Sequence, residues 1–298
     1  MKRGTVIGIA AGAVAICVAA GAAWWLLNRP PSAEETAEAY LRALSQGDAD
    51  AVGDLLMDQP DGWERIASTF EGAEDYLTDY EFALHDDGSV RADVELAGRP
   101  AVVGFVLSDA GGRWTVAGDY LASLDVTTTI GDSVRIGGVL HPVGTVSLLP
   151  ARYTVAAAPA GLVDGEATAI VTNDEPVAAG VEASLSPEAV PVAQEQLDVY
   201  LQTCAQPAGA VPSHCGIRVP WAADLASLEQ VSFRIETLPV LALAPDARTF
   251  AATGGVLVAT AAGTTRSGDP ASFTYRADDW AVRGTVTMTG DTMTLAVD

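Results

Sequence analysis

The spacing of hydrophobic and polar residues changes several times along the chain, and each change predicts a different element. Residues 5–27 contain no charged side chain, a pattern typical of a helix with apolar surroundings on every side. At about 1.5 Å per helical residue this stretch is roughly 34 Å long, enough to cross the hydrocarbon core of a bilayer. We predict a cytoplasmic cap over residues 1–4, a transmembrane helix over residues 5–27 and a linker over residues 28–32.

The charges on either side of the predicted span indicate its orientation. Lys2 and Arg3 precede the span, whereas all 39 acidic residues and 14 of the 16 basic residues follow it. Basic residues favour the cytoplasmic side, and Trp24 and Trp25 lie where an aromatic belt is expected. We therefore expect a single-pass protein of the cell membrane, with a cytoplasmic N-terminus, an extracytoplasmic ectodomain and contact with the lipid bilayer through residues 5–27. Removal of the span as a signal peptide is the alternative, although the apolar run is longer than a usual signal core.

After the span, the apolar spacing is first helical and then alternating. Ser32 and Glu35 form a capping-box pattern that predicts a helix start, and apolar residues follow at helical spacing: Ala37, Tyr40, Leu41 and Leu44. Two further short helices are expected, beginning at Asp48 and Asp61. From Asp79 the period becomes two, which predicts antiparallel strands.

This order of helices and strands resembles that of the nuclear-transport-factor-two-like (cystatin-like) superfamily over residues 33–121. The resemblance rests on Tyr40-Leu41 in the first helix, Gly47-Asp48 at its end and the Gly-Gly-Arg-Trp-Thr-Val run in the last strand. It implies a concave sheet, which in this superfamily often carries a pocket. The candidate lining residues are Tyr40, Trp63, Tyr80, His85 and Trp114, with core packing as the alternative role.

Residues 122–185 show no helical spacing and predict a small antiparallel β-sandwich. The run Leu148-Leu149-Pro150-Ala151-Arg152-Tyr153-Thr154-Val155 resembles the turn motif of small PEGA-type envelope sandwiches, with Ala151 where that family usually has glycine. Proline fixes one turn dihedral and the tyrosine re-enters the core, so we interpret the motif as a stabilising element.

The last predicted unit, residues 186–298, begins with a helix after Ser186 and continues with strands. The expected strands are residues 230–237, 240–243, 248–252, 255–261, 271–276, 280–288 and 292–297, with an acidic turn at Asp278-Asp279. Cys204 and Cys215 flank a short Pro- and Gly-containing loop, and an oxidising compartment favours a disulfide between them. The fold class expected for the whole chain is α+β: a transmembrane helix, a cystatin-like unit, a β-sandwich and a second helix-plus-antiparallel-sheet unit.

Composition excludes several functions. Without Lys2 and Arg3, the ectodomain has 14 basic against 39 acidic residues, and such a charge repels nucleic acid. Lys2 is the only lysine, so phosphate-binding Gly-Lys-Ser/Thr loops and Schiff-base chemistry have no lysine in the ectodomain. The three histidines, His85, His141 and His214, are far apart in sequence, and we expect each at a turn or on the surface. We predict no metal site, no cofactor and no enzymatic activity.

The order of span, cystatin-like unit and envelope sandwich resembles the teicoplanin-resistance-associated membrane proteins of Gram-positive bacteria, without their cytoplasmic zinc ribbon. The Ala- and Arg-rich, Lys-poor composition favours an actinobacterial type of protein. The resemblance implies a non-catalytic binding or scaffold role in the cell envelope, with a protein or glycan partner. The alternative is a small-ligand receptor or pocket enzyme that uses the cavity of residues 33–121.

Overall fold

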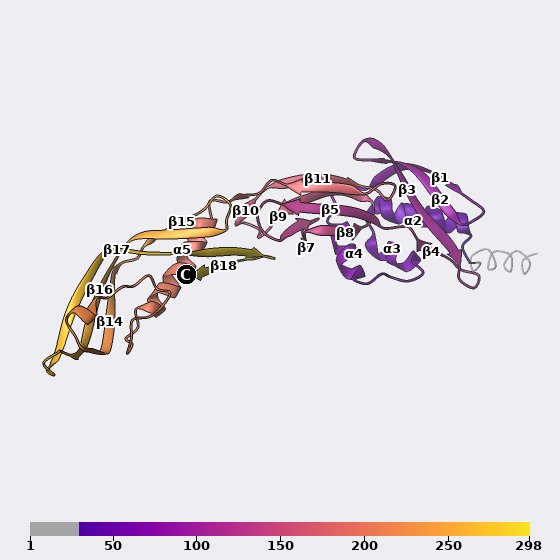
Figure 1. The fold of residues 1–298 in the computed structure, drawn as a ribbon. Helices are drawn as coiled ribbons and strands as arrows, with labels where there is room; N and C mark the ends of the chain where they lie inside the picture. Colours follow the sequence, from indigo (N-terminus) through magenta and orange to yellow (C-terminus); the bar gives the residue numbers. More distant parts are fainter. Residues whose placement is uncertain (1–29) are drawn as a thin grey trace, which may run out of the picture.

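The structure, a computed structural model, describes residues 30–298. The predicted cap, the predicted span over residues 5–27 and its Trp24-Trp25 pair lie outside the described residues. Within them the chain combines four α-helices with mainly antiparallel sheets, so the expected α+β class is confirmed (Figure 1). The longest described helix has 16 residues, and no described helix is both long and apolar enough to cross a membrane.

The N-terminal unit packs three helices against a four-stranded antiparallel sheet in the order β1-β2-β3-β4. Its elements are α2 (Ala33–Gln46), α3 (Ala49–Leu55), α4 (Trp63–Glu71), β1 (Leu77–Leu84), β2 (Ser89–Leu96), β3 (Arg99–Asp109) and β4 (Trp114–Gly118). The Ser32–Glu35 capping box begins α2 as predicted, and Asp48 caps α3 by accepting the Ala51 N–H. The predicted Asp61 cap of the third helix is wrong, because Gly62 in a left-handed conformation precedes α4.

The middle unit consists of strands alone. They are β5 (Ala122–Thr128), β6 (Ser133–Ile136), β7 (Val139–Pro142), β8 (Gly144–Leu148), β9 (Ala151–Ala157), β10 (Val163–Asp164), β11 (Glu166–Val171), β12 (Val177–Val181) and β13 (Ser184–Leu185). They form sheets in the orders β11-β9-β6-β7 and β12-β5-β8 and the pair β10-β13, and only β12 and β5 run parallel among the described strands. Tyr153 is fully buried and its hydroxyl donates to the Leu149 carbonyl at 2.7 Å, as expected of a stabilising turn motif.

The C-terminal unit packs one helix against a strongly elongated sheet in the order β14-β16-β17-β18, with β15 beside β16. Its elements are α5 (Ala189–Cys204), the 3-10 helix η1 (Trp221–Ala223), β14 (Ser227–Thr237), β15 (Val240–Leu243), β16 (Thr249–Thr264), β17 (Pro270–Thr289) and β18 (Thr292–Val297).

The expected turns inside the last sheet are wrong. The predicted strands 248–252 and 255–261 are one strand, β16, and the predicted strands 271–276 and 280–288 are one strand, β17. Shifts of register between β16 and β17 accommodate Gly254 and the Asp278-Asp279 pair as β-bulges. A bulge bends a strand without ending it, so both strands continue past residues that are typical of turns.

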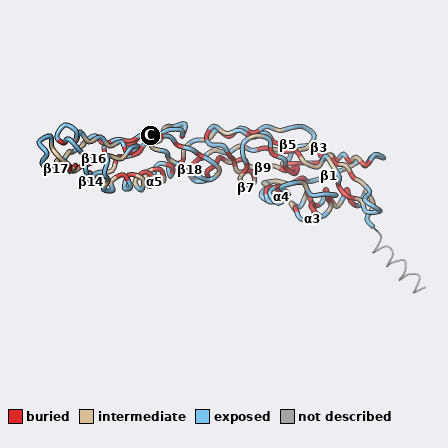
Figure 2. Tube along the Cα trace, turned by 60° about the horizontal axis from the view of Figure 1, so that its bottom comes forward, coloured by how far each residue is buried: buried red, intermediate tan, exposed pale blue. Residues whose placement is uncertain are grey.

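The three units follow one another in a row, with residue 30 at one end and the C-terminal unit at the other (Figure 1). Buried residues occur within each unit, as the tube coloured by burial shows (Figure 2). At the first junction the Glu74 N–H donates to the Arg152 carbonyl at 2.8 Å and the Arg152 N–H donates to the Asp75 carbonyl at 2.9 Å. At the second junction the Ser186 N–H donates to the Leu162 carbonyl at 3.0 Å, and the Gly290 N–H donates to the Asp132 carboxylate at 3.0 Å. Arg135 pairs with Asp291 there. Main-chain bonds therefore fix both junctions.

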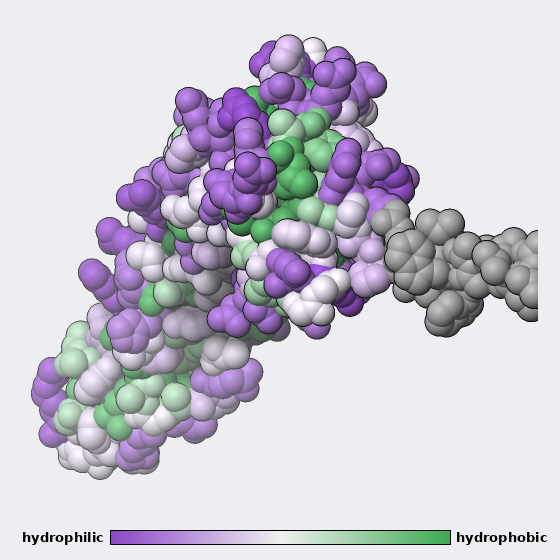
Figure 3. Space-filling model, turned by 90° about the vertical axis from the view of Figure 1, so that its right-hand side faces the viewer, coloured by the Kyte–Doolittle hydropathy of each residue, from purple (hydrophilic) through white to green (hydrophobic). Residues whose placement is uncertain are grey.

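The surface is mainly hydrophilic. Seen from the end nearest residue 30, purple hydrophilic residues cover most of the molecule and surround one patch of hydrophobic residues on the N-terminal unit (Figure 3).

Candidate functional site

Tyr40, the central candidate for a pocket in the N-terminal unit, lies in the core. Its exposed fraction is 0%, and its ring centroid is 4.6 Å from that of Phe105 on β3. Within residues 30–298 its hydroxyl finds no hydrogen-bond partner. Burial, with a smaller effect of Tyr120, raises the pKa of Tyr40 well above its ordinary value, so the group stays neutral.

The other four candidates lie at different places in the N-terminal unit. Trp63, Tyr80 and Trp114 are half-buried and pack against the core from α4, β1 and β4. His85 is exposed at the turn between β1 and β2. None of these four, nor Tyr40, lines either of the two cavities described below.

His141 is buried, so the expectation of a turn or surface position is wrong for this histidine. It lies on β7 with an exposed fraction of 3%, and its Nε2 is 2.9 Å from the Thr69 hydroxyl of α4. The Thr69 hydroxyl donates to the Arg65 carbonyl, so the His141 N–H is the donor of the first bond. Burial and the nearby charge of Arg65 lower the pKa of His141 to about 4, which keeps the ring neutral.

The two other histidines are exposed, as predicted: His85 in the β1–β2 turn and His214 in the loop after α5. The Asn173-Asp174-Glu175 run forms a loop, where the Asn173 side chain accepts the Gly104 N–H at 3.0 Å from the N-terminal unit. These residues connect units and give no constellation for acid–base chemistry.

The predicted disulfide is present. Cys204 at the end of α5 and Cys215 have their sulfurs 2.00 Å apart. The Cys215 carbonyl accepts the indole N–H of the buried Trp280 at 2.9 Å. The disulfide and this bond together hold the start of the following loop against β17.

The larger cavity lies between this loop and the long hairpin of β16 and β17. It has a volume of about 770 Å³, and its lining includes Ile217 and Arg218 from the loop, Leu257 from β16, and Tyr275, Asp279 and Arg283 from β17. The size is in the range of small-molecule sites. The far end of the loop is held by Asp224, which accepts a 2.7 Å hydrogen bond from the Tyr275 hydroxyl. Partial burial and this bond raise the pKa of Tyr275 to about 12.

Among the strands of residues 30–298, none lies beside the edge of β17 that faces this cavity. β18 pairs with Gly284–Thr289 only, although β17 extends back to Pro270. The pairing ends where the Asp298 N–H donates to the Arg283 carbonyl at 3.0 Å. Gly216 touches this edge, because a Cβ built there would lie 2.2 Å from the Ala281 carbonyl oxygen. Beyond that contact, main-chain groups of β17 are available to a ligand in the cavity.

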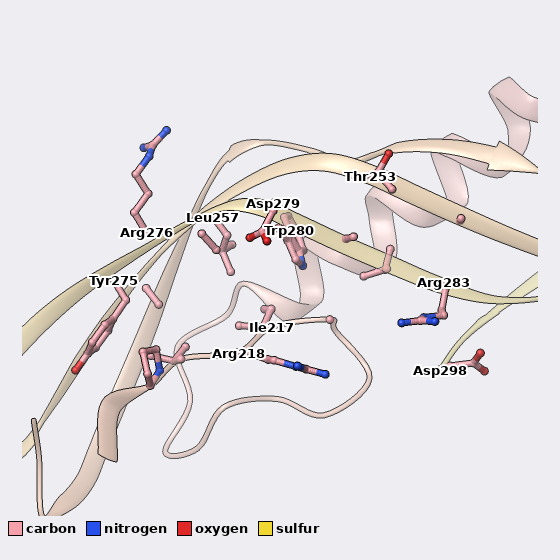
Figure 4. A pocket seen from close by; sticks show the side chains of 18 residues that line it. Ile217, Arg218, Thr253, Leu257, Tyr275, Arg276, Asp279, Trp280, Arg283 and Asp298 are labelled. Atoms are coloured by element: carbon pink, nitrogen blue, oxygen red, sulfur yellow. The ribbon is translucent and has the colours of Figure 1, made fainter. Parts of the chain in front are cut away.

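The cavity contains charged side chains of both signs without partners among the described residues. Arg218 and Arg283 have no ion pair or side-chain hydrogen bond in residues 30–298, and the same holds for the carboxylate of Asp279. Figure 4 shows Arg218 from the loop and Arg283 from β17 extending toward the same space. Arg276, by contrast, points away from the loop in Figure 4 and pairs with Glu236 and Asp278.

A second, smaller cavity of about 380 Å³ lies between the N-terminal and middle units. Its lining includes Arg99 and Pro100 from β3, Ile170 from β11, and Asp174 and Glu175 from the loop that follows β11. The lining holds two carboxylates and one arginine, and Asp174 pairs with Arg91. This cavity therefore offers less to an anionic ligand than the cavity beside β17 does.

Within the described part of the chain, no group of three or more His, Cys, Asp or Glu side chains is placed to hold a metal ion. Comparison of the chain with protein-family models, with curated proteins and with solved structures gives no match.

Proposed function

We propose that this protein is a membrane-anchored, extracytoplasmic binding or scaffold protein of the cell envelope. In this proposal residues 5–27 hold the chain in the bilayer with a cytoplasmic N-terminus. The N-terminal unit is cystatin-like, the middle unit is a PEGA-like sandwich, and both serve to present the C-terminal unit. The partner is an envelope protein or glycan, and the role is binding rather than catalysis.

One observation carries this proposal. The three units lie in a row with main-chain bonds at both junctions, and the larger cavity belongs to the unit farthest from residue 30 (Figure 1). A chain tethered just before residue 30 would therefore hold that cavity away from the membrane. Three helices on a four-stranded antiparallel sheet support the cystatin-like interpretation, and two strand-only sheets support the sandwich.

We assign the binding site to the C-terminal unit rather than to the N-terminal unit. Tyr40 and Phe105 fill the middle of the N-terminal core, and His85 lies exposed at a turn. A receptor or enzyme that used residues 33–121 would need a cavity with polar groups there. The unpartnered charges lie beside β17 instead.

Labelling in intact cells tests the proposal. Ser267 is exposed in the turn between β16 and β17, and a Ser267→Cys variant of the full chain would offer one thiol there. We expect a membrane-impermeant maleimide to label this thiol in intact cells, and to label a Gly4→Cys variant only after permeabilisation. The reverse pattern would contradict the proposed orientation, and release of the chain from the membrane fraction would contradict the anchor.

A further inference from the structure

We propose that the cavity between residues 216–220 and β17 binds a short zwitterionic peptide. Arg218 and Arg283 would hold its carboxylate, and Asp279 would hold its ammonium group. This inference rests on the proposed binding function and adds the class of ligand and the residues that recognise it.

Arg218 and Arg283 indicate that the ligand carries a negative charge. Neither arginine of this cavity forms an ion pair within residues 30–298, although the chain has 39 acidic residues and 16 basic residues. Arg218 and Arg283 nevertheless extend toward one space from two different elements (Figure 4). Two converging guanidinium groups repel each other unless an anion lies between them, and guanidinium binds a carboxylate with two parallel hydrogen bonds.

The acidic residues of the lining indicate that the ligand is a zwitterion rather than an anion. Asp279 lines the same cavity and has no partner among the residues described, and Asp298 lines it beside Arg283. A ligand with negative charge alone would be repelled by these carboxylates. A ligand that carries both a carboxylate and an ammonium group matches charges of both signs.

The size and the remaining lining favour a peptide over a single amino acid. The volume of about 770 Å³ exceeds what one small amino acid fills. Leu257 and Ile217 offer apolar contact, and the edge of β17 that no strand covers offers N–H and C=O groups. Peptide amides pair with such groups in the same way as a neighbouring strand does.

The loop is held so that the cavity persists without a ligand. Cys215 is tied to Cys204 by the disulfide and to Trp280 by a hydrogen bond, and Asp224 is tied to Tyr275. Residues 216–220 span the distance between these anchors. A preformed site avoids part of the ordering cost of binding.

Calorimetry on the full chain in detergent micelles tests the inference. The probes are tri-alanine, N-acetyl-tri-alanine, tri-alanine amide and alanine. We expect tri-alanine to bind, and each of the other three to bind at least about tenfold more weakly because a charged end or main-chain contacts are missing.

Matched variants locate the site. We expect Arg218→Gln, Arg283→Gln and Asp279→Asn each to weaken tri-alanine binding about tenfold or more. Arg248→Gln is the control for the arginines, because Arg248 is exposed in the same unit outside the cavity lining. Asp278→Asn is the control for Asp279, because Asp278 bonds Arg276, which points away from the loop.

Three results would overturn the inference. They are no saturable binding of tri-alanine up to about 10 mM, equal binding of the end-blocked peptides, and binding that the cavity variants leave unchanged. Any of these results would leave the proposed anchoring and orientation intact, since labelling of Ser267→Cys measures those separately.

Discussion

At the scale of single residues, two buried tyrosines differ in what their hydroxyl groups contact. The Tyr40 hydroxyl has no partner among the described residues, whereas the Tyr153 hydroxyl donates to the Leu149 carbonyl. A buried polar group without a hydrogen bond costs about 1–3 kcal/mol. We expect Tyr40→Phe to raise the free energy of unfolding by about 1 kcal/mol and Tyr153→Phe to lower it by a similar amount. Urea denaturation followed by circular dichroism measures both, and equal destabilisation by the two variants would contradict the assignment for Tyr40.

His141 gives a prediction for pH at the same scale. Its pKa is lowered from 6.5 to about 4 in the folded chain, so the unfolded chain binds the extra proton between these values. Stability therefore falls as the pH decreases through this window, by about 1.4 kcal/mol per pH unit at most. Well above pH 6.5 the histidine is neutral in both states and contributes no pH dependence.

A His141→Gln variant provides the control for this effect. Glutamine keeps an N–H donor for the Thr69 hydroxyl but does not titrate. The lowered pKa of His141 destabilises the wild type as the pH falls from 6.5 to 4, whereas the variant lacks this effect. We therefore expect the unfolding free energy of the wild type to fall relative to that of the variant over this range. The carboxylates titrate in both proteins, so their effect cancels in this comparison. A difference in unfolding free energy that stays constant across this range would contradict a neutral, buried His141 ring.

At the scale of elements, the N-terminal and middle units approach each other closely at two glycines, Gly72 and Gly137. A Cβ added to Gly72 would lie 1.9 Å from the Gly137 carbonyl oxygen, too close for any side chain. We expect Gly72→Ala to cost about 1–3 kcal/mol, because the backbone of one unit must move. Gly118→Ala is the control, since no atom lies within 4 Å of its Cβ position and the change should be neutral or slightly stabilising.

Limited proteolysis checks this prediction. The Gly72 variant should be cleaved faster than wild type near residues 73–76, where the junction bonds of Glu74 and Asp75 would be strained. Equal cleavage of the Gly72 and Gly118 variants would show that the two units do not depend on this contact.

The Cys204–Cys215 disulfide is expected to stabilise the loop that follows α5. It closes a loop with a sequence separation of 11, which in the chain-entropy model is worth about 3 kcal/mol. We expect a Cys204→Ala/Cys215→Ala variant to lose roughly this amount and to be cleaved by protease within residues 205–226. An unchanged urea midpoint would show that the contacts of Trp280 and Asp224 hold the loop without the disulfide.

The sequence predicts elements well where the signal is local. The helix α2 follows from its capping box and apolar spacing, and the disulfide follows from two cysteines and the expected compartment. Gly254 and Asp278-Asp279 resemble turns in sequence, yet β16 and β17 continue through them. Their pairing partners lie tens of residues away, and the local composition does not indicate which residues pair.

The candidate site was less predictable for the same reason. Arg218 and Arg283 are 65 positions apart, and they meet only because the disulfide and Trp280 hold the loop against β17. The available signal was an arginine in a disulfide-anchored loop of an acidic, almost lysine-free chain. The buried position of His141 had no such signal, because His141-Pro142 also fits a turn.

At the scale of the whole molecule, the row of three units predicts how residues 30–298 scatter X-rays. A compact protein of the same 269 residues, 30–298, would have a radius of gyration of about 18 Å. The units lie end to end instead (Figure 1), so we expect a value well above this for residues 30–298. A radius near that of the compact protein would contradict the arrangement.

The radius of gyration also tests whether ion pairs or main-chain hydrogen bonds hold the three units in a row. The Arg152 ion pairs with Glu74 and Asp75 are partly exposed, and such pairs weaken with salt. The main-chain bonds between residues 74–75 and Arg152 do not depend on side-chain charge. The same holds at the second junction for the bond from the Ser186 N–H to the Leu162 carbonyl. We therefore expect the radius of gyration to stay constant between low and high salt. A change with salt would mean that ion pairs set the spacing between the units, and that this spacing varies with ionic strength.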